Sequence, residues 1–160
     1  MSTATRRIFT SLSVLSVLLT LGFIFGNSCL PQEESAELSG NVLSFLQRIF
    51  GTESAFAKFL STYVRKLAHF TEFGLLALEA FLFTRVRQLP LHKSVFFLLP
   101  FGFLVAATDE TLQIFTSRGA SFVDVLIDFC GFLTVTLLTC LTVIIYRKRK
   151  DKKENKNATV

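Results

Sequence analysis

Histidine and acidic side chains recur inside three strongly apolar stretches of this 160-residue chain. His69 and Glu72 lie in the first stretch, Asp109 in the second, and Asp124 and Asp128 in the third. A carboxylate in hydrocarbon costs several kcal/mol, so such residues usually face a protein interior or a water-filled cavity. We therefore expect these side chains to form one polar site within an otherwise apolar protein.

The spacing within each stretch is that of a helix with one polar face. Arg65, His69 and Glu72 are four and three positions apart. The pairs in the other two stretches are each four apart, namely Asp109 with Gln113 and Asp124 with Asp128. Residues three or four positions apart lie on one side of an α helix. Each stretch is thus predicted to present its polar side chains together.

The residue types suit proton transfer and ligand binding. Histidine exchanges a proton near neutral pH, and two close carboxylates can divide the roles of acid and base. If the protein is an enzyme, we predict that His69, Glu72 and Asp109 are catalytic. The other polar residues are predicted to bind a ligand: Arg65, Lys66, Glu110, Gln113, Arg118, Ser121, Asp124 and Asp128.

Other interpretations of these residues stay open. Polar side chains also hold membrane helices together, so the cluster could serve packing alone. A metal ion is an alternative because His69 and the carboxylates are suitable ligands. The single local histidine and the absence of any CxxC pair disfavour it, and no metal or cofactor is assigned. Arg118 could pair with Asp109 or Asp124 or contact a ligand.

Four segments are long enough to position these residues in a bilayer, which takes about 20 mostly apolar residues. They cover residues 8–26, 63–84, 94–115 and 122–146. The first could be a signal peptide, but its length and weak cleavage motif favour a retained helix. The predicted fold is all-α and integral to the membrane. It has one domain over residues 1–146 and a basic cytoplasmic tail over 147–160.

The charges between the spans predict the orientation. Twelve of the seventeen Lys and Arg residues lie before the first span, between the second and third, or after the fourth. By the positive-inside rule, both termini are then cytoplasmic. Residues 27–62 and the turn 116–121, where Ser121 can cap the last helix, face outward. The polar residues therefore share the outer half of the membrane.

The outer segment is predicted to contain one or two amphipathic helices over about residues 35–61. Apolar side chains recur there at helical spacing: Leu38, Val42, Phe45, Leu46, Ile49 and Phe50. Gly51 interrupts this pattern, and Thr52 can cap a new start. These helices either cover the polar site as a lid or pack on the bundle at the membrane surface.

The composition indicates which class of partner to expect. The chain is 51% hydrophobic, with 19 phenylalanines and no tryptophan, which fits a lipid-facing protein better than a soluble domain. The tail RKRKDKKENKN could bind nucleic acid. A basic run directly after a span is more simply an anchor that meets anionic lipid. We expect membrane lipids, and no nucleic acid, as partners.

Two motifs resemble the VanZ-like family of bacterial membrane proteins. They are RKLAHFTEFGLLAL at residues 65–78 and DETLQIFTSRGASFVDVLIDFCG at residues 109–131. The family pattern is Lys-x-x-His-Phe-x-Glu, then Asp-Glu-x-x-Gln-x-Phe, a turn with Arg, and an Asp near the start of the last helix. The matching residues are Lys66, His69, Phe70, Glu72, Asp109, Glu110, Gln113, Phe115, Arg118, Ser121 and Asp124. The resemblance implies a four-helix topology, in agreement with the spans.

The chain departs from that pattern in three places. Phe73 stands where tyrosine is common, Thr116-Ser117 replaces Pro-Gly, and Asp128 stands where asparagine is common. The missing hydroxyl and the added negative charge could alter the ligand or the proton chemistry. The founding member of the family is linked to teicoplanin resistance, so the resemblance implies a role at the envelope of a Gram-positive bacterium. It supplies no reaction.

Three functions follow as hypotheses. The protein could reduce sensitivity to glycopeptides such as teicoplanin without catalysis, by altering drug access or by binding a lipid-linked or glycopeptide ligand. It could be a membrane enzyme that acts on a lipid or cell-wall precursor. It could also be a structural protein whose polar residues only pack helices.

The topology makes a prediction that labelling can test. In a background without native cysteines, Ser35→Cys and Ser117→Cys should each react with a membrane-impermeant thiol reagent on intact cells. Both positions lie in segments predicted to face outward. Labelling that requires cell lysis would overturn the orientation.

Overall fold

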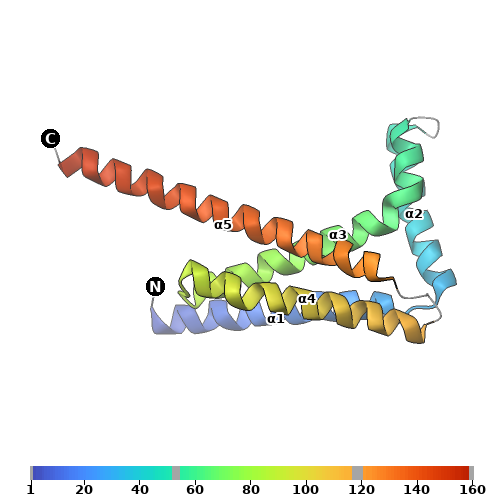
Figure 1. The fold of residues 1–160 in the computed structure, drawn as a ribbon, viewed down its shortest axis with the longest axis horizontal. Helices are drawn as coiled ribbons and strands as arrows, with labels where there is room; N and C mark the ends of the chain where they lie inside the picture. Colours follow the sequence, from blue (N-terminus) through green and yellow to red (C-terminus); the bar gives the residue numbers. More distant parts are fainter. Residues whose placement is uncertain (1, 52–54, 117–120, 159–160) are drawn as a thin grey trace.

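The computed structural model describes residues 2–51, 55–116 and 121–158, which form five α helices and no strand (Figure 1). The helices, in chain order, are α1 (Thr3–Ser28), α2 (Gln32–Phe50), α3 (Ala55–Val86), α4 (Leu91–Phe115) and α5 (Phe122–Ala158). The prediction of an all-α fold is confirmed. Residues 117–120 of the predicted turn 116–121, including Arg118, lie outside the described residues, as does Thr52.

Four helices contain stretches long and apolar enough to cross a membrane. These stretches are Thr3–Ser28, Thr62–Val86, Leu91–Phe115 and Phe122–Asn155. Each includes one of the four spans predicted from the sequence and extends it by a few residues or more. The prediction of four transmembrane helices is therefore confirmed by length and composition.

The helix ends follow from local sequence. Ser2 caps α1 by accepting a hydrogen bond from the Thr5 backbone N–H at 3.1 Å. Gly51 ends α2 with a φ of +82°, a conformation that glycine adopts without steric cost. Arg85 holds the link from α3 to α4 by donating to the Leu89 carbonyl and, at 2.9 Å, to the Ser94 hydroxyl. These contacts keep α3 and α4 antiparallel neighbours.

The centre of the bundle is α3, which packs against the other four helices. Its buried face carries Phe73, Leu76 and Ala77, and α5 contributes the fully buried Phe132. Most large apolar side chains on the outer helix faces remain exposed in the isolated chain, for example Leu12, Leu15, Leu19, Phe96, Leu104, Leu137 and Leu141. Such an outer surface suits contact with lipid. The apolar exterior agrees with a membrane bundle.

The amphipathic segment differs in one respect from its prediction. α2 is separate and packs against α3, with Val42, Phe45 and Ile49 exposed on one face. Residues 55–61, predicted as a surface helix, are instead the first turns of α3 and continue into the second span. No glycine or proline separates them from Thr62, so nothing in the sequence ends the helix there. Figure 1 shows α2 and the start of α3 standing away from the bundle axis.

The basic tail is also helical. α5 continues through the basic run as far as Ala158, well past the other helices in Figure 1. Lysine, arginine and glutamate are strong helix formers, and no proline or glycine interrupts them. Lys150 and Glu154 add an exposed ion pair at 3.6 Å, one helical turn apart. The tail is therefore a helical extension of the last span.

Close contact between α3 and α5 depends on Gly131. A Cβ added there would lie 2.2 Å from the carbonyl oxygen of Phe70. Small residues allow membrane helices to approach in this way. At Gly22 on α1, an added Cβ would meet nothing within 4 Å.

We predict that Gly131→Ala destabilises the protein by about 1–3 kcal/mol, because the added methyl group forces α3 and α5 apart. Gly22→Ala should leave stability unchanged or raise it by up to about 1 kcal/mol, since alanine is the better helix former. The measurement is thermal unfolding of both purified variants in detergent. A Gly131→Ala variant as stable as wild type would contradict the described helix contact.

Candidate functional site

Four helices meet in a polar region at one end of the bundle. α1 ends there at Ser28, α4 ends there at Phe115, and α5 begins there at Phe122. A cavity of about 220 Å³ lies between the helices of this region. It is lined by Thr62, Arg65, Lys66, His69, Gln113, Asp124, Ile127 and Asp128. Six of the residues predicted to bind or catalyse thus line one cavity.

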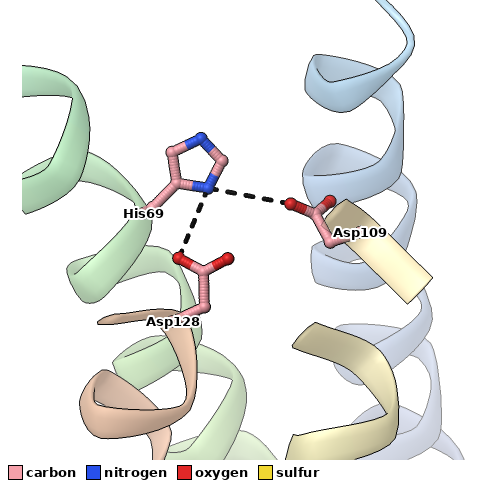
Figure 2. A group of neighbouring side chains, drawn as sticks. All are labelled: His69, Asp109 and Asp128. Carbon is pink, nitrogen blue, oxygen red and sulfur yellow. Dashed lines mark ion pairs between the residues drawn. The ribbon is translucent and has the colours of Figure 1, made fainter. Parts of the chain in front are cut away.

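The inner part of the site is a cluster of His69, Asp109 and Asp128, one residue from each of α3, α4 and α5 (Figure 2). His69 Nδ1 lies 3.8 Å from Asp109 Oδ2 and 3.7 Å from Asp128 Oδ1. Asp109 is completely buried, and Asp128 is 2% exposed. These separations exceed a direct hydrogen bond of about 2.7–3.2 Å. They allow an ion pair when the imidazole is protonated.

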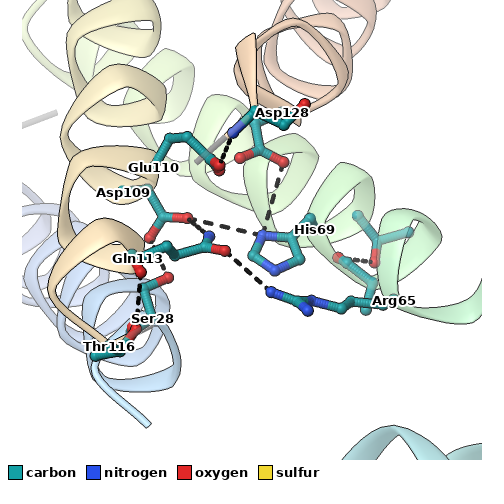
Figure 3. Close-up of polar contacts among 11 residues, drawn as sticks. Ser28, Arg65, His69, Asp109, Glu110, Gln113, Thr116 and Asp128 are labelled. Carbon is teal, nitrogen blue, oxygen red and sulfur yellow. Dashed lines mark hydrogen bonds and ion pairs between the residues drawn. The ribbon is translucent and has the colours of Figure 1, made fainter. Parts of the chain in front are cut away.

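Asp109 is held in place by hydrogen bonds from α1 and from its own helix, α4, and α3 supports the second of these (Figure 3). The Ser28 hydroxyl on α1 donates to Asp109 Oδ1 at 2.6 Å. Gln113 Nε2, one turn along α4, donates to Asp109 Oδ2 at 3.1 Å. Arg65 on α3 then donates to Gln113 Oε1 at 3.0 Å. The carboxylate orientation is thus fixed before any ligand binds.

Ser28 is a site residue that sequence reasoning missed. It is fully buried, and its carbonyl oxygen also accepts a hydrogen bond from the Thr116 hydroxyl at 3.2 Å. In the sequence, the polar pair Asn27-Ser28 at the end of the first span indicates this role, because it lies at the membrane level of the other polar residues. That span carries no acidic or basic residue after Arg7, so the pattern of charges does not identify Ser28 as a site residue.

Glu110 and Ser121 join the ends of α4 and α5. Glu110 is 4% exposed, and its Oε1 accepts a hydrogen bond from the Ser121 backbone N–H. The Ser121 carbonyl accepts the first helical hydrogen bonds of α5, from Asp124 at 2.9 Å and Val125 at 3.3 Å. Glu110 and Ser121, which were both predicted to bind a ligand, therefore contact each other and join α4 to α5. Glu110 Oε2 is buried without a hydrogen-bond partner among the described residues.

Two cationic side chains line the cavity nearer its exposed side. Lys66 Nζ lies 3.4 Å from Asp124 Oδ1, and both side chains are nearly half exposed. Arg65 is half-buried and is joined to Gln113. Cations therefore line the more exposed part, whereas His69, Asp109 and Asp128 form the buried part.

Glu72 does not belong to this cluster. It lies one turn further along α3, outside the cavity lining and the three-residue group around His69. Its Oε2 is buried without a hydrogen-bond partner among the described residues. Asp128, predicted only to bind a ligand, is the second acidic residue beside His69. Deeper in the bundle, Glu79 accepts a hydrogen bond from Ser16 at 2.7 Å, a contact that joins α1 to α3.

The arrangement combines one imidazole nitrogen and two carboxylate oxygens, all within 4.8 Å of one another. It can move a proton between histidine and a carboxylate. It also contains donor atoms that suit a divalent metal ion. Arg65 and Lys66 can attract an anionic group into the cavity.

The sequence profile of the VanZ/LLP1 family matches residues 13–145, which cover most of the chain. The chain belongs to the VanZ/LLP1 family. The matched region contains the polar cluster, the cavity and the greater part of all four spans. No curated protein and no solved structure matches the chain. Within this VanZ/LLP1 domain, the polar residues of both motifs come from different helices and meet at one end.

We predict that Ser28→Ala destabilises the VanZ/LLP1 domain by about 1–3 kcal/mol, because Asp109 loses a buried charge-assisted hydrogen bond. Ser13→Ala is a matched control, since that hydroxyl only donates to the Phe9 carbonyl of its own helix. Thermal unfolding in detergent measures both effects. Equal melting temperatures for the two variants would show that the Ser28–Asp109 contact adds no stability.

Proposed function

We propose that this VanZ/LLP1 protein lowers the sensitivity of a bacterial cell to glycopeptide antibiotics such as teicoplanin. The polar cavity would act by binding a head group at the outer side of the plasma membrane. The observation that carries this proposal is the cavity itself, with Arg65 and Lys66 along it and the His69 cluster at its buried end.

The size of the cavity favours a small polar group as its occupant. Pockets for drug-sized molecules usually measure about 300–1,000 Å³, and this one measures about 220 Å³. A whole glycopeptide is larger than a typical drug. The phosphate-bearing head group of a lipid-linked wall precursor is a better fit, because Arg and Lys recognise phosphate through charge-assisted hydrogen bonds. The acyl portion of such a lipid would stay in the bilayer beside the helices.

Basic residues support an outward orientation of the cavity. Arg6, Arg7 and Arg87 line a pocket formed by the start of α1 and the link that follows α3, away from the polar site. The basic end of α5 lies on that side of the bundle too (Figure 1). Cytoplasmic loops and ends of membrane proteins are rich in Lys and Arg. We infer that both termini are cytoplasmic and that the cavity opens outward.

Catalysis on a lipid or cell-wall precursor is the second candidate. It is favoured by the position of His69 between Asp109 and Asp128, where an imidazole and carboxylates can exchange protons. A head group held by Arg65 and Lys66 would then be the substrate. A purely structural role would need no cavity, although the contacts from Ser28 and Gln113 to Asp109 would serve it equally well.

The test is antibiotic susceptibility in a Gram-positive host that expresses each variant at matched membrane levels. We expect wild type to raise the inhibitory concentration of teicoplanin, and His69→Ala and Lys66→Gln to lose most of that protection. His92→Ala is the control, because this exposed histidine lies in the first turn of α4, outside the site. Vancomycin, measured in parallel, shows whether the protection is specific to teicoplanin.

Two outcomes would count against the proposal. Absence of protection by wild type would remove the antibiotic role, and protection that survives both site variants would remove the cavity as its cause. Binding and catalysis separate through Asp109→Asn and Asp128→Asn, which keep side-chain shape. If the protein is an enzyme, we expect these two variants to lose protection against teicoplanin although they are still present in the membrane.

A further inference from the structure

From the geometry of the His69 cluster we infer a binding site for one divalent transition-metal ion, held by His69, Asp109 and Asp128. Each ligand comes from a different helix, so no short sequence motif contains all three. Figure 2 shows the imidazole and both carboxylates directed toward a common space. This inference goes beyond the proposed antibiotic role and does not depend on it.

The distances between the donor atoms of His69, Asp109 and Asp128 suit a shared metal ion better than direct hydrogen bonds. Zinc bonds to histidine nitrogen and carboxylate oxygen measure about 2.0–2.2 Å. Two tetrahedral ligands are therefore about 3.4 Å apart. His69 Nδ1 lies 3.8 Å and 3.7 Å from the two carboxylate oxygens. All three donor atoms lie within 4.8 Å. The two His69 separations exceed the tetrahedral spacing by a few tenths of an ångström, and side-chain shifts of up to about 1.4 Å would close the widest pair around an ion.

The state of Asp128 is an independent indication. The residue is 2% exposed, yet its Oδ2 has no hydrogen-bond partner among the described residues. A buried carboxylate without full pairing is costly, and most in proteins are satisfied by hydrogen bonds, ion pairs or metals. The described cations nearest the cavity are engaged elsewhere, Arg65 with Gln113 and Lys66 with Asp124. His69 Nδ1 lies 3.7 Å from Asp128 Oδ1, and a dication between them would compensate the charge of this carboxylate.

Asp109 has the supporting contacts that metal ligands usually have. Protein ligands to metals are commonly oriented by hydrogen bonds from a surrounding set of residues. Ser28 and Gln113 provide these bonds for Asp109, and Arg65 in turn holds Gln113. The carboxylate is thereby aligned by residues of α1, α3 and α4. Rigid support of this kind lowers the cost of assembling a site.

The donor set also indicates which ions fit. Imidazole favours zinc and similar metals, whereas carboxylates favour harder ions such as manganese. One imidazole with two carboxylates therefore suits Zn²⁺ or Mn²⁺. Three protein ligands leave at least one coordination position open. His69 and Asp128 also line the cavity, so an anionic oxygen of a ligand in the cavity could take that position.

The experiment measures metal binding by the purified full-length protein in detergent. The protein is dialysed against buffered Zn²⁺ or Mn²⁺, and bound metal is quantified by atomic spectroscopy. We expect about one ion per chain for wild type, and affinity at least about tenfold weaker for His69→Ala and for the near-isosteric Asp128→Asn. His92→Ala is the matched control and should bind as wild type does, since it removes the other histidine of the chain.

Two results would overturn the site. One is wild-type protein that retains neither ion above a detergent blank. The other is metal binding that His69→Ala and Asp128→Asn leave unchanged, which would assign it to another part of the chain. Circular dichroism and gel filtration confirm that the variants are folded, and the wild-type measurement decides the question even if one variant is not. Wild-type protein that binds the metal ion but gives no protection against teicoplanin would count against the proposed function alone.

Discussion

The structure depends on the high cost of placing charge in an apolar bundle. Asp109, Glu110 and Asp128 are all nearly or fully buried on helices whose outer faces are apolar. Each of these side chains is expensive there unless other groups compensate it. The chain meets this constraint by bringing the ends of α1 and α4, the beginning of α5 and the span-forming part of α3 together. A polar interior at one end and an apolar exterior follow from this one requirement.

Helix packing makes that convergence possible. Gly131 lets α5 approach the backbone of α3 at Phe70, the residue after His69. Gly102 makes room on α4 for the buried ring of Phe132. Small residues at helix crossings are the usual means of close approach in membranes. The apolar packing below the site therefore sets the distances between the polar groups within it.

The site has two parts with different physical character. Arg65, Lys66 and Asp124 lie where solvent reaches them, so they can attract and exchange anionic groups. His69, Asp109 and Asp128 lie deeper, where electrostatic interactions are stronger because water is scarce. A head group held by the first part and a metal ion held by the second are compatible, since both parts line or border one cavity. Hydrogen bonds from Arg65 to Gln113 and from Gln113 to Asp109 connect the two parts of the site.

The sequence by itself determined the four spans, because about 20 apolar residues in a row carry enough hydrophobicity to identify a membrane helix. It also determined which polar residues share a face within each helix, since that follows from 3.6 residues per turn. Tertiary structure alone decided how the faces are rotated toward one another. Periodicity does not specify the rotation of one helix relative to another. Only the packed structure shows that Asp128 rather than Glu72 stands beside His69, and that Ser28 reaches Asp109 from a helix with no charged residue after Arg7. The continuation of residues 55–61 into α3 was already set by the local sequence, because no glycine or proline ends the helix before Thr62.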